Sequence, residues 1–197
     1  MMAEILSTSG VSDLPDEGNT LDPSKLLSGD LVIGLIGYAG AGCTDVYKRL
    51  DFFLKAHGFE THRVKLSDGI ANCSNDPSLK AELKSGEDKL VRAVRLQDLG
   101  DTLRAQYNSE AVASLALREI KQIRSVASVK RRAIIVDSLK HPAEIDLFKI
   151  VYERSFLLIG VYCGKDTRLA RLQDKFFGVE DEKIENFMKR DERDPNS

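Results

Sequence analysis

This chain of 197 residues has no tryptophan, only three cysteines and five prolines, and an aromatic content of 7%. The cysteines (Cys43, Cys73 and Cys163) are few, odd in number and widely spaced, which argues against the disulfide framework of small secreted domains. No apolar run approaches the length of about 20 residues that a transmembrane helix needs. The basic segment and apolar core of a signal peptide are missing as well. We therefore expect a cytoplasmic protein with no membrane partner.

The chain also lacks an excess of charge of either sign. It has 29 Lys and Arg residues against 31 Asp and Glu residues, for a formal net charge of −2. This balance gives no extended basic field, so bulk binding to DNA or to an anionic membrane is not expected. Local anion sites remain compatible with it. The 42% of hydrophobic residues is enough for one substantial core.

Apolar runs that alternate with helical patterns predict an α/β fold. Four short strands are expected at residues 31–36, 61–66, 133–137 and 156–162. Helices are expected at residues 44–56, 90–103, 112–123, 142–153, 166–175 and 180–190, with short helical pieces and loops at 70–86. Such an order implies a parallel sheet with helices on both faces and ligands at the carboxyl ends of its strands. We see no fifth strand, so the sheet is expected to lack its last one.

The domain organisation follows from a change in composition. Residues 1–30 are rich in Ser, Gly, Asp, Pro and Thr and carry too little apolar surface to order themselves. We predict a flexible amino-terminal tail there. Residues 31–197 then form a single domain.

The most informative motif lies where the first predicted strand ends. Gly37 and Gly42 stand at the spacing of the phosphate loop G-x-x-x-x-G-K-[ST], and Thr44 is in register with its last position. Backbone N–H groups of such a loop converge on phosphate oxygens at the positive end of a helix. The alternative is a tight turn whose glycines only permit close packing. We favour nucleotide binding by this segment, named here the glycine loop (residues 37–44) and made of Gly37, Tyr38, Ala39, Gly40, Ala41, Gly42, Cys43 and Thr44.

Cys43 stands where the motif has its lysine. That lysine would reach the outer phosphates and neutralise charge that develops during phosphoryl transfer. Nucleotide binding is therefore expected rather than phosphoryl transfer. Cys43 is either a reactive thiol at a positive helix end or a small neutral filler, and we favour the filler because a thiolate would repel phosphates.

Polar residues after the second and third predicted strands extend the candidate site. Asp137 ends the third strand and is a candidate magnesium ligand together with Thr44, although aspartate commonly ends strands and caps helices. Asp68, after the second strand, is a candidate acceptor-site carboxylate. Arg104 is a candidate to bind a phosphate or carboxylate group in a second nucleotide pocket. Surface salt bridges are the alternative for Asp68 and Arg104.

Two arginines follow the fourth predicted strand. Arg168 and Arg171 are three residues apart, which places them on one helix face. Such arginines clamp phosphates in nucleotide kinases. A solvated basic face is the alternative.

The order of elements resembles that of P-loop nucleotide kinases, and residues 95–104 resemble a helix of dephospho-coenzyme A kinase-like proteins. A closer similarity, over about residues 29–194, is to the kinase-like amino-terminal domain of the anti-phage dCTP deaminases, large members of the deoxycytidylate deaminase family. Its most distinctive block is Ser-Leu-Lys-His-Pro-x-Glu. The similarity rests on residues 31–37, 97–100, 137–144 and 158–162.

This resemblance implies a P-loop nucleotide-kinase-like module with a degenerate phosphate loop, beside a separate carboxyl-terminal zinc domain that deaminates dCTP or dCMP. The present sequence lacks the H-x-E and P-C-x-x-C signature, so no zinc site and no deamination are expected of it. We expect a fragment that ends before the deaminase domain. The resemblance also implies a homo-oligomer and restraint by a small regulatory RNA.

We therefore expect a regulatory domain that binds a nucleoside triphosphate (ATP or a dNTP) with magnesium and biases an attached or separate deaminase domain. One alternative is a nucleoside or nucleotide kinase in which Arg168 or Arg171 replaces the missing lysine. A second alternative is a structural oligomerisation module whose phosphate loop is a relic.

Overall fold

The computed structural model describes residues 30–74, 76–81, 85–126 and 131–192. Of the predicted tail, residues 1–29 lie outside the described residues, and Asp30 is the first residue of a strand. The described elements are, in chain order, β1 (Asp30–Ile36), α3 (Cys43–Ala56), β2 (Glu60–Lys65), α4 (Leu66–Cys73), the 3-10 turn η1 (Pro77–Leu79), α5 (Gly86–Gln106), α6 (Ala111–Val126), β3 (Arg132–Leu139), α7 (Pro142–Tyr152), the 3-10 turn η2 (Glu153–Ser155), β4 (Phe156–Gly160), α8 (Lys165–Lys175) and α9 (Asp181–Asp191).

The four strands form one parallel sheet in the order β2-β3-β1-β4. β1 and β3 lie in its centre, where seven of the eight β3 residues are buried. This burial explains their continuous apolar sequences, since both faces of a parallel sheet are covered by helices. The predicted α/β class with a parallel, nucleotide-kinase-like sheet is confirmed.

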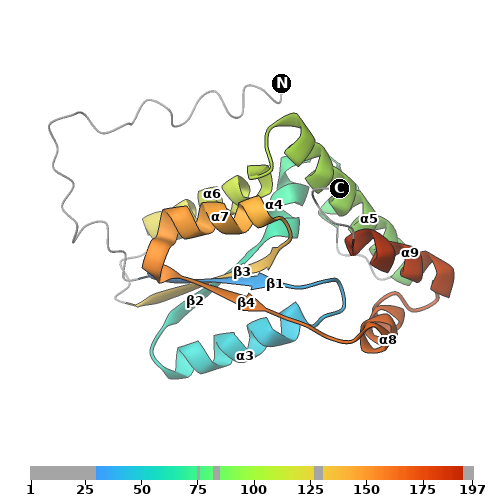
Figure 1. The fold of residues 1–197 in the computed structure, drawn as a ribbon, viewed down its shortest axis with the longest axis horizontal. Coiled ribbons are helices and arrows are strands. Elements are labelled where there is room, and N and C mark those ends of the chain that lie inside the picture. Colours follow the sequence, from blue (N-terminus) through green and yellow to red (C-terminus); the bar gives the residue numbers. More distant parts are fainter. Residues whose placement is uncertain (1–29, 75, 82–84, 127–130, 193–197) are drawn as a thin grey trace, which may run out of the picture.

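Helices cover the two faces of the sheet separately (Figure 1). α3 packs on one face against β1 and β3 through Ile33, Leu35 and Leu54. On the other face α4, α6 and α7 contribute Ile70, Ile120 and Phe148 to the largest core. The sheet is therefore a rigid base whose strands β1 and β3 both end at the same edge.

A smaller apolar core joins α5, α8 and α9 beyond that edge (Figure 1). Phe176 and Phe187 meet edge to face with ring centroids 5.6 Å apart, and Leu90, Leu172 and Ile184 complete the contact. No helix within the described ranges is both long enough and apolar enough to cross a bilayer. This three-helix unit places the end of α9 beside the carboxyl ends of the strands.

The segment after β2 differs from its prediction. We predict a strand through residue 66 followed by mixed structure, whereas β2 ends at Lys65 and α4 begins at once with Leu66. Leu66, Ile70 and Ala71 are buried at helical spacing, and their packing on the sheet overrides the polar character of the segment. Asp68 consequently lies in the first turn of a helix. β4 also ends earlier than predicted, at Gly160.

Candidate functional site

The glycine loop connects β1 to α3 in a conformation that requires its glycines. Gly40 and Gly42 have φ angles of 80° and 109°, in the left-handed region that other residues rarely adopt. The Ala41 N–H donates to the Tyr38 carbonyl at 2.9 Å, which closes a turn, and Gly42 is the N-cap of α3. The loop therefore wraps the amino-terminal end of α3 as a phosphate-binding turn does.

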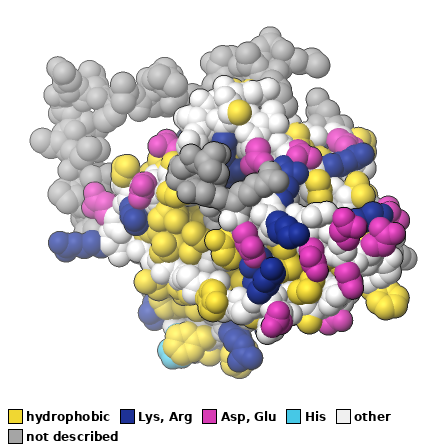
Figure 2. All heavy atoms as spheres, turned by 45° about the vertical axis from the view of Figure 1, so that its right-hand side comes forward, with side chains coloured by type: hydrophobic (Ala, Val, Ile, Leu, Met, Phe, Trp, Pro, Cys, Tyr) yellow, Lys and Arg dark blue, Asp and Glu magenta, His cyan; other side chains and the backbone are white. Residues whose placement is uncertain are grey.

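A large open pocket lies between the glycine loop, α4, α5 and the end of α9. Asp68, Arg104, Asp137 and Arg171 all line it, so the structure brings together most of the residues predicted from sequence. On the face drawn in Figure 2 basic and acidic side chains are interspersed, in agreement with the small net charge. The pocket lies at the carboxyl edge of the sheet, where ligands of such folds bind.

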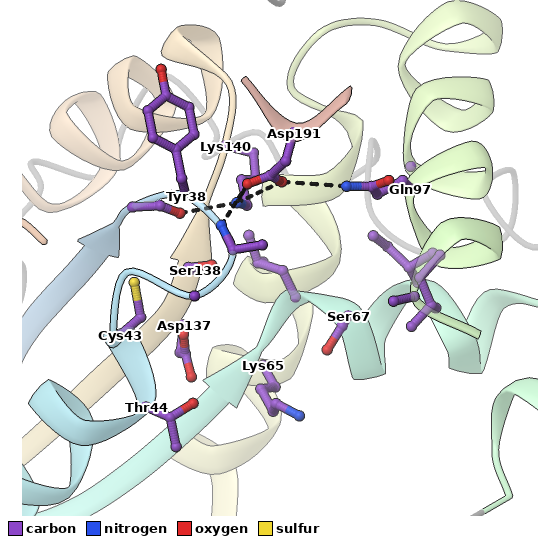
Figure 3. Close-up of a pocket in the computed structure, with 18 of the residues that line it drawn as sticks. Tyr38, Cys43, Thr44, Lys65, Ser67, Gln97, Asp137, Ser138, Lys140 and Asp191 are labelled. Atoms are coloured by element: carbon purple, nitrogen blue, oxygen red, sulfur yellow. Dashed lines mark hydrogen bonds and ion pairs between the residues drawn. The ribbon is translucent and has the colours of Figure 1, made fainter. Parts of the chain in front are cut away.

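Thr44 and Asp137 lie near each other at the foot of this pocket (Figure 3). Both contact Arg63. Arg63 of β2 donates from Nε to Asp137 Oδ2 at 3.1 Å, and its Nη2 makes a shorter contact with the same oxygen. Arg63 Nη2 also lies 3.4 Å from Thr44 Oγ1. The two predicted magnesium ligands thus face one position, and a guanidinium contacts both.

Asp191, at the end of α9, points into the glycine loop (Figure 3). Its side chain is only 6% exposed. The Ala39 N–H donates to Asp191 Oδ2 at 2.5 Å, and Lys140 Nζ lies 3.0 and 3.1 Å from the two carboxylate oxygens. Gln97 Nε2 donates to Asp191 Oδ1 at 3.3 Å. A carboxylate from another part of the chain is therefore bound by a backbone N–H of the loop.

Lys140 follows β3 and reaches the glycine loop from a different element. Its ammonium donates to the Gly37 carbonyl at 2.9 Å. The loop that carries Lys140 is fixed by Glu144, whose Oε2 accepts the N–H groups of Lys140 and His141 at 2.9 and 3.2 Å. His141 in turn caps α7, with Pro142 in the first turn. His141 thus has a structural role in starting that helix.

Arg168 and Arg171 have different surroundings, although they share a helix. Arg171 lines the pocket and donates to the carbonyls of Ala41 and Gly40 at 3.0 and 3.3 Å. Arg168 is buried and does not line it. Its Nε donates to the Ala39 carbonyl at 3.0 Å and its Nη1 lies 2.6 Å from Glu192. The solvated-face alternative is wrong for Arg168, which joins α8, α9 and the glycine loop.

Arg104 and Asp68 lie in the same pocket with different partners. Arg104 Nη2 is 2.6 Å from Glu144 Oε1, and the Glu144 side chain is fully buried. The surface-salt-bridge alternative is therefore wrong for Arg104. Its second partner, Asp101 at 3.3 Å, is exposed. Asp68 is exposed, 3.8 Å from Lys65, which agrees with a weak surface pair.

The Cys43 thiol lies at the start of α3 inside this site. Burial, and after it the charge of Asp137, raises the pKa of Cys43, although the Lys140 ammonium opposes the shift. The thiol is accordingly neutral at physiological pH. This agrees with the filler interpretation and not with a reactive thiolate.

Three contributors to the site are missed by sequence reasoning: Arg63, Lys140 and Asp191. Lys140 had a usable signal, because it follows a central strand directly and ligands gather at strand ends. Arg63 lies inside a strand, and the neighbouring residues carry no motif that indicates a functional role for it. Asp191 belongs to a charged run that is typical of a solvated helix end. Within the described ranges no group of three or more His, Cys, Asp or Glu side chains has an arrangement that could hold a metal ion.

Comparison with known proteins gives a distant relationship. No protein-family profile matches the chain. A UPF0200 protein of Methanothermobacter thermautotrophicus is 26% identical over 164 residues, which are 83% of this chain and 72% of the relative. UPF0200 proteins of Methanosarcina mazei and Methanosarcina barkeri are 31% and 32% identical over 85 residues, about 44% of each relative. The chain is a distant homologue of these archaeal proteins.

This relationship and the parallel α/β fold both fit a nucleotide-binding P-loop domain. The names of the UPF0200 relatives mention no deaminase. The resemblance to the anti-phage dCTP deaminases therefore stays a prediction from the sequence.

Proposed function

We propose that this chain is a nucleotide-binding regulatory domain that holds the phosphates of a nucleoside triphosphate, ATP or a dNTP, on the glycine loop. The observation that carries the proposal is the bond from the Ala39 N–H to the buried Asp191 carboxylate. It supports a loop whose backbone N–H groups donate to an anionic oxygen. Gly40 and Gly42, in the left-handed region, hold the backbone open for that contact.

Magnesium is the cation that such a fold implies, and the residues at the foot of the pocket fit it. The Thr44 hydroxyl and the Asp137 carboxylate supply oxygen donors, which Mg²⁺ prefers. Their shared contact with Arg63 supports a position that accepts positive charge. Thr44 and Asp137 would hold Mg²⁺ at this position, and the ion would supply positive charge beside the phosphates. Asp137→Asn is then expected to remove any dependence of nucleotide binding on magnesium.

Regulation, rather than turnover, is favoured by Cys43 at the lysine position of the phosphate loop. Without that lysine the charge that develops in transfer has one fewer counter-charge. Occupancy of the loop would instead change the position of α9 and so inform an attached or partner deaminase domain. The family resemblance adds homo-oligomeric assembly and a small regulatory RNA to the proposal. The composition adds a cytoplasmic location.

A kinase is the second candidate, and one observation favours it. Lys140 brings an ammonium to 2.9 Å from the Gly37 carbonyl, so the loop is not without a lysine. Release of ADP from Mg-ATP in the presence of nucleosides and nucleoside monophosphates distinguishes the two candidates. Turnover that Asp137→Asn abolishes would support the kinase, and saturable binding without turnover supports the regulatory domain.

The binding proposal is tested by calorimetric titration with ATP, GTP, dCTP and dTTP, with and without magnesium. Gly42→Asp should abolish binding, because the φ of +109° strains any side chain at this position and the added carboxylate would repel phosphates on the loop. Gly58→Asp is the matched control. Gly58 also has a positive φ, of 78°, but lies past the far end of α3 with no atom within 4 Å of a Cβ. Equal binding by the parent chain and both variants would refute a site on the loop.

A further inference from the structure

The lysine position of the glycine loop is filled by Cys43, yet an ammonium is present at the loop. Lys140 contacts the carbonyl of Gly37, the first residue of the loop, at 2.9 Å. Its side chain is 37% exposed, so it faces the open pocket instead of being locked in the core. The capping of α7 by Glu144 fixes the backbone from which it extends. Lys140 is thus a lysine delivered from the β3–α7 connection to the phosphate loop.

The second observation is what Lys140 holds. Within the described part of the chain, the Asp191 carboxylate accepts from three donors: the Ala39 N–H, the Lys140 ammonium and the Gln97 amide. This is the set of contacts that a phosphate oxygen would find in a phosphate loop. The carboxylate is an anionic oxygen donor of similar size, supplied by the chain itself.

The place of Asp191 on α9 makes this contact costly for the helix. Asp191 is the last residue of α9, where the negative end of the helix dipole disfavours a carboxylate. Its neighbours also reach different elements, since Arg190 pairs with Asp98 at 2.6 Å and Glu192 with Arg168 at 2.6 Å. Three consecutive side chains therefore hold the end of α9 over the loop against an unfavourable local field.

We propose that Lys140 contacts the outer phosphates of the bound nucleotide in place of the missing loop lysine, and that Asp191 occupies this phosphate subsite until a nucleotide displaces it. The inference rests on the proposed function. It adds Lys140 as a residue that binds the outer phosphates and Asp191 as a group of the chain that competes with them. Binding of a triphosphate releases the end of α9, which couples the site to whatever α9 contacts.

The test compares Asp191→Asn, Lys140→Met and the double variant by calorimetric titration with ATP and with dCTP, in magnesium. Asp191→Asn removes the competing charge and should tighten binding about tenfold, because the hydrogen bonds that the loop and Lys140 make to residue 191 are then no longer charge-assisted by its carboxylate. Lys140→Met in the Asp191→Asn background should then weaken binding about 10- to 100-fold, as expected for loss of one charged hydrogen bond. Cys43→Lys should restore part of that loss.

The double variant separates a phosphate contact from a structural role. If Lys140 only holds Asp191 in place, its removal is without effect once Asp191 is neutral, and that result would overturn the inference. Lys149→Met on α7 removes an equally positive but exposed charge and should change nothing. Circular dichroism at each step confirms that the variants are folded.

Failure of the inference and failure of the proposed function give different results. If neither the parent nor Asp191→Asn binds any triphosphate, both are wrong. If the parent binds and Gly42→Asp abolishes binding, but Lys140→Met in the Asp191→Asn background binds as tightly as Asp191→Asn alone, only the role of Lys140 is wrong. Unchanged affinity in Asp191→Asn would refute the competitor.

Discussion

Arg104 Nη2 lies 2.6 Å from Glu144 Oε1, and this pair joins α5 to α7 beneath the candidate site. The Glu144 side chain is fully buried, and its other oxygen binds the N–H groups of Lys140 and His141. One carboxylate therefore anchors two helices and the connection that carries Lys140. Both oxygens of this buried carboxylate have hydrogen-bond partners, so loss of any one partner should destabilise the fold.

Glu144→Gln should lower the free energy of unfolding by about 3 kcal/mol, because the amide places donors against Arg104 or against the backbone N–H groups. Urea denaturation followed by circular dichroism measures this loss as a lower midpoint at an unchanged slope. Asp146→Asn removes an acid from the same helix, where its pair with Lys149 is exposed on both sides. That control should change stability by less than about 0.5 kcal/mol. Equal effects of the two substitutions would contradict the anchoring role.

The Cys43 thiol predicts how stability and alkylation depend on pH. Burial and the Asp137 charge raise the pKa of its thiol above the value in the unfolded chain. Ionisation of this thiol thus favours unfolding: its contribution to stability is complete below the unfolded pKa and is lost as pH rises through the folded pKa. In a Cys73→Ser/Cys163→Ser background, the rate of alkylation by iodoacetamide should rise with a higher midpoint pH in the native protein than in urea. A lower native midpoint would instead indicate a reactive thiolate.

Arg168→Lys should loosen the end of α9. Arg168 bonds the Ala39 carbonyl from Nε at 3.0 Å and Glu192 from Nη1 at 2.6 Å. The single nitrogen of a lysine cannot replace both of these separated donors. Hydrogen exchange of the α9 and glycine-loop amides should accelerate about 10-fold or more, as loss of a charged hydrogen bond implies. Lys183→Met removes an exposed charge from α9 and should leave the exchange rates of these amides unchanged. Slow exchange retained in Arg168→Lys would mean that other contacts hold α9.

Gly86 controls how α5 meets the end of α8. A Cβ at this position would lie 2.2 Å from the Phe177 carbonyl oxygen and 2.7 Å from the Phe176 carbonyl carbon, both of them backbone atoms. Gly86→Ala should therefore cost about 1–3 kcal/mol of stability, measured by thermal and urea denaturation. Gly164→Ala, where no atom lies within 4 Å of a Cβ, is the control. A stabilised Gly86→Ala variant would show that the two helices separate readily.

The architecture could be predicted because strong local patterns decide it. The apolar runs of β1 and β3 must be buried on both faces, so their place in the centre of a parallel sheet follows from sequence. The glycine loop follows from the apolar run before it, the spacing of Gly37 and Gly42, Thr44 and the helix after it. The start of α4 does not follow from sequence, because a strand and a helix meet at Lys65 and Leu66 without a turn residue between them.

Most of the predicted site residues that line the pocket follow a strand end, whereas Arg104 of α5 and Arg171 of α8 do not. The Ala39–Asp191 contact spans 152 positions, and no local pattern encodes such a pairing. The burial of Arg168 fits neither a phosphate clamp nor a solvated face. Helical spacing does not predict this burial, because it cannot show that Glu192 at the end of α9 pairs with Arg168. Long-range packing of α5, α8 and α9 thus determines which charged side chains reach the site. The conformation of the glycine loop follows from local sequence.

The central claim is that the glycine loop binds nucleotide phosphates. We would record amide ¹H–¹⁵N spectra of the ¹⁵N-labelled chain during titration with ATP and with dCTP in magnesium. Saturable shifts of the Gly40, Ala41 and Gly42 amides, with Gly58 unmoved, are the result that this account predicts. Unmoved loop amides at millimolar nucleotide, or shifts confined to other parts of the chain, would contradict it.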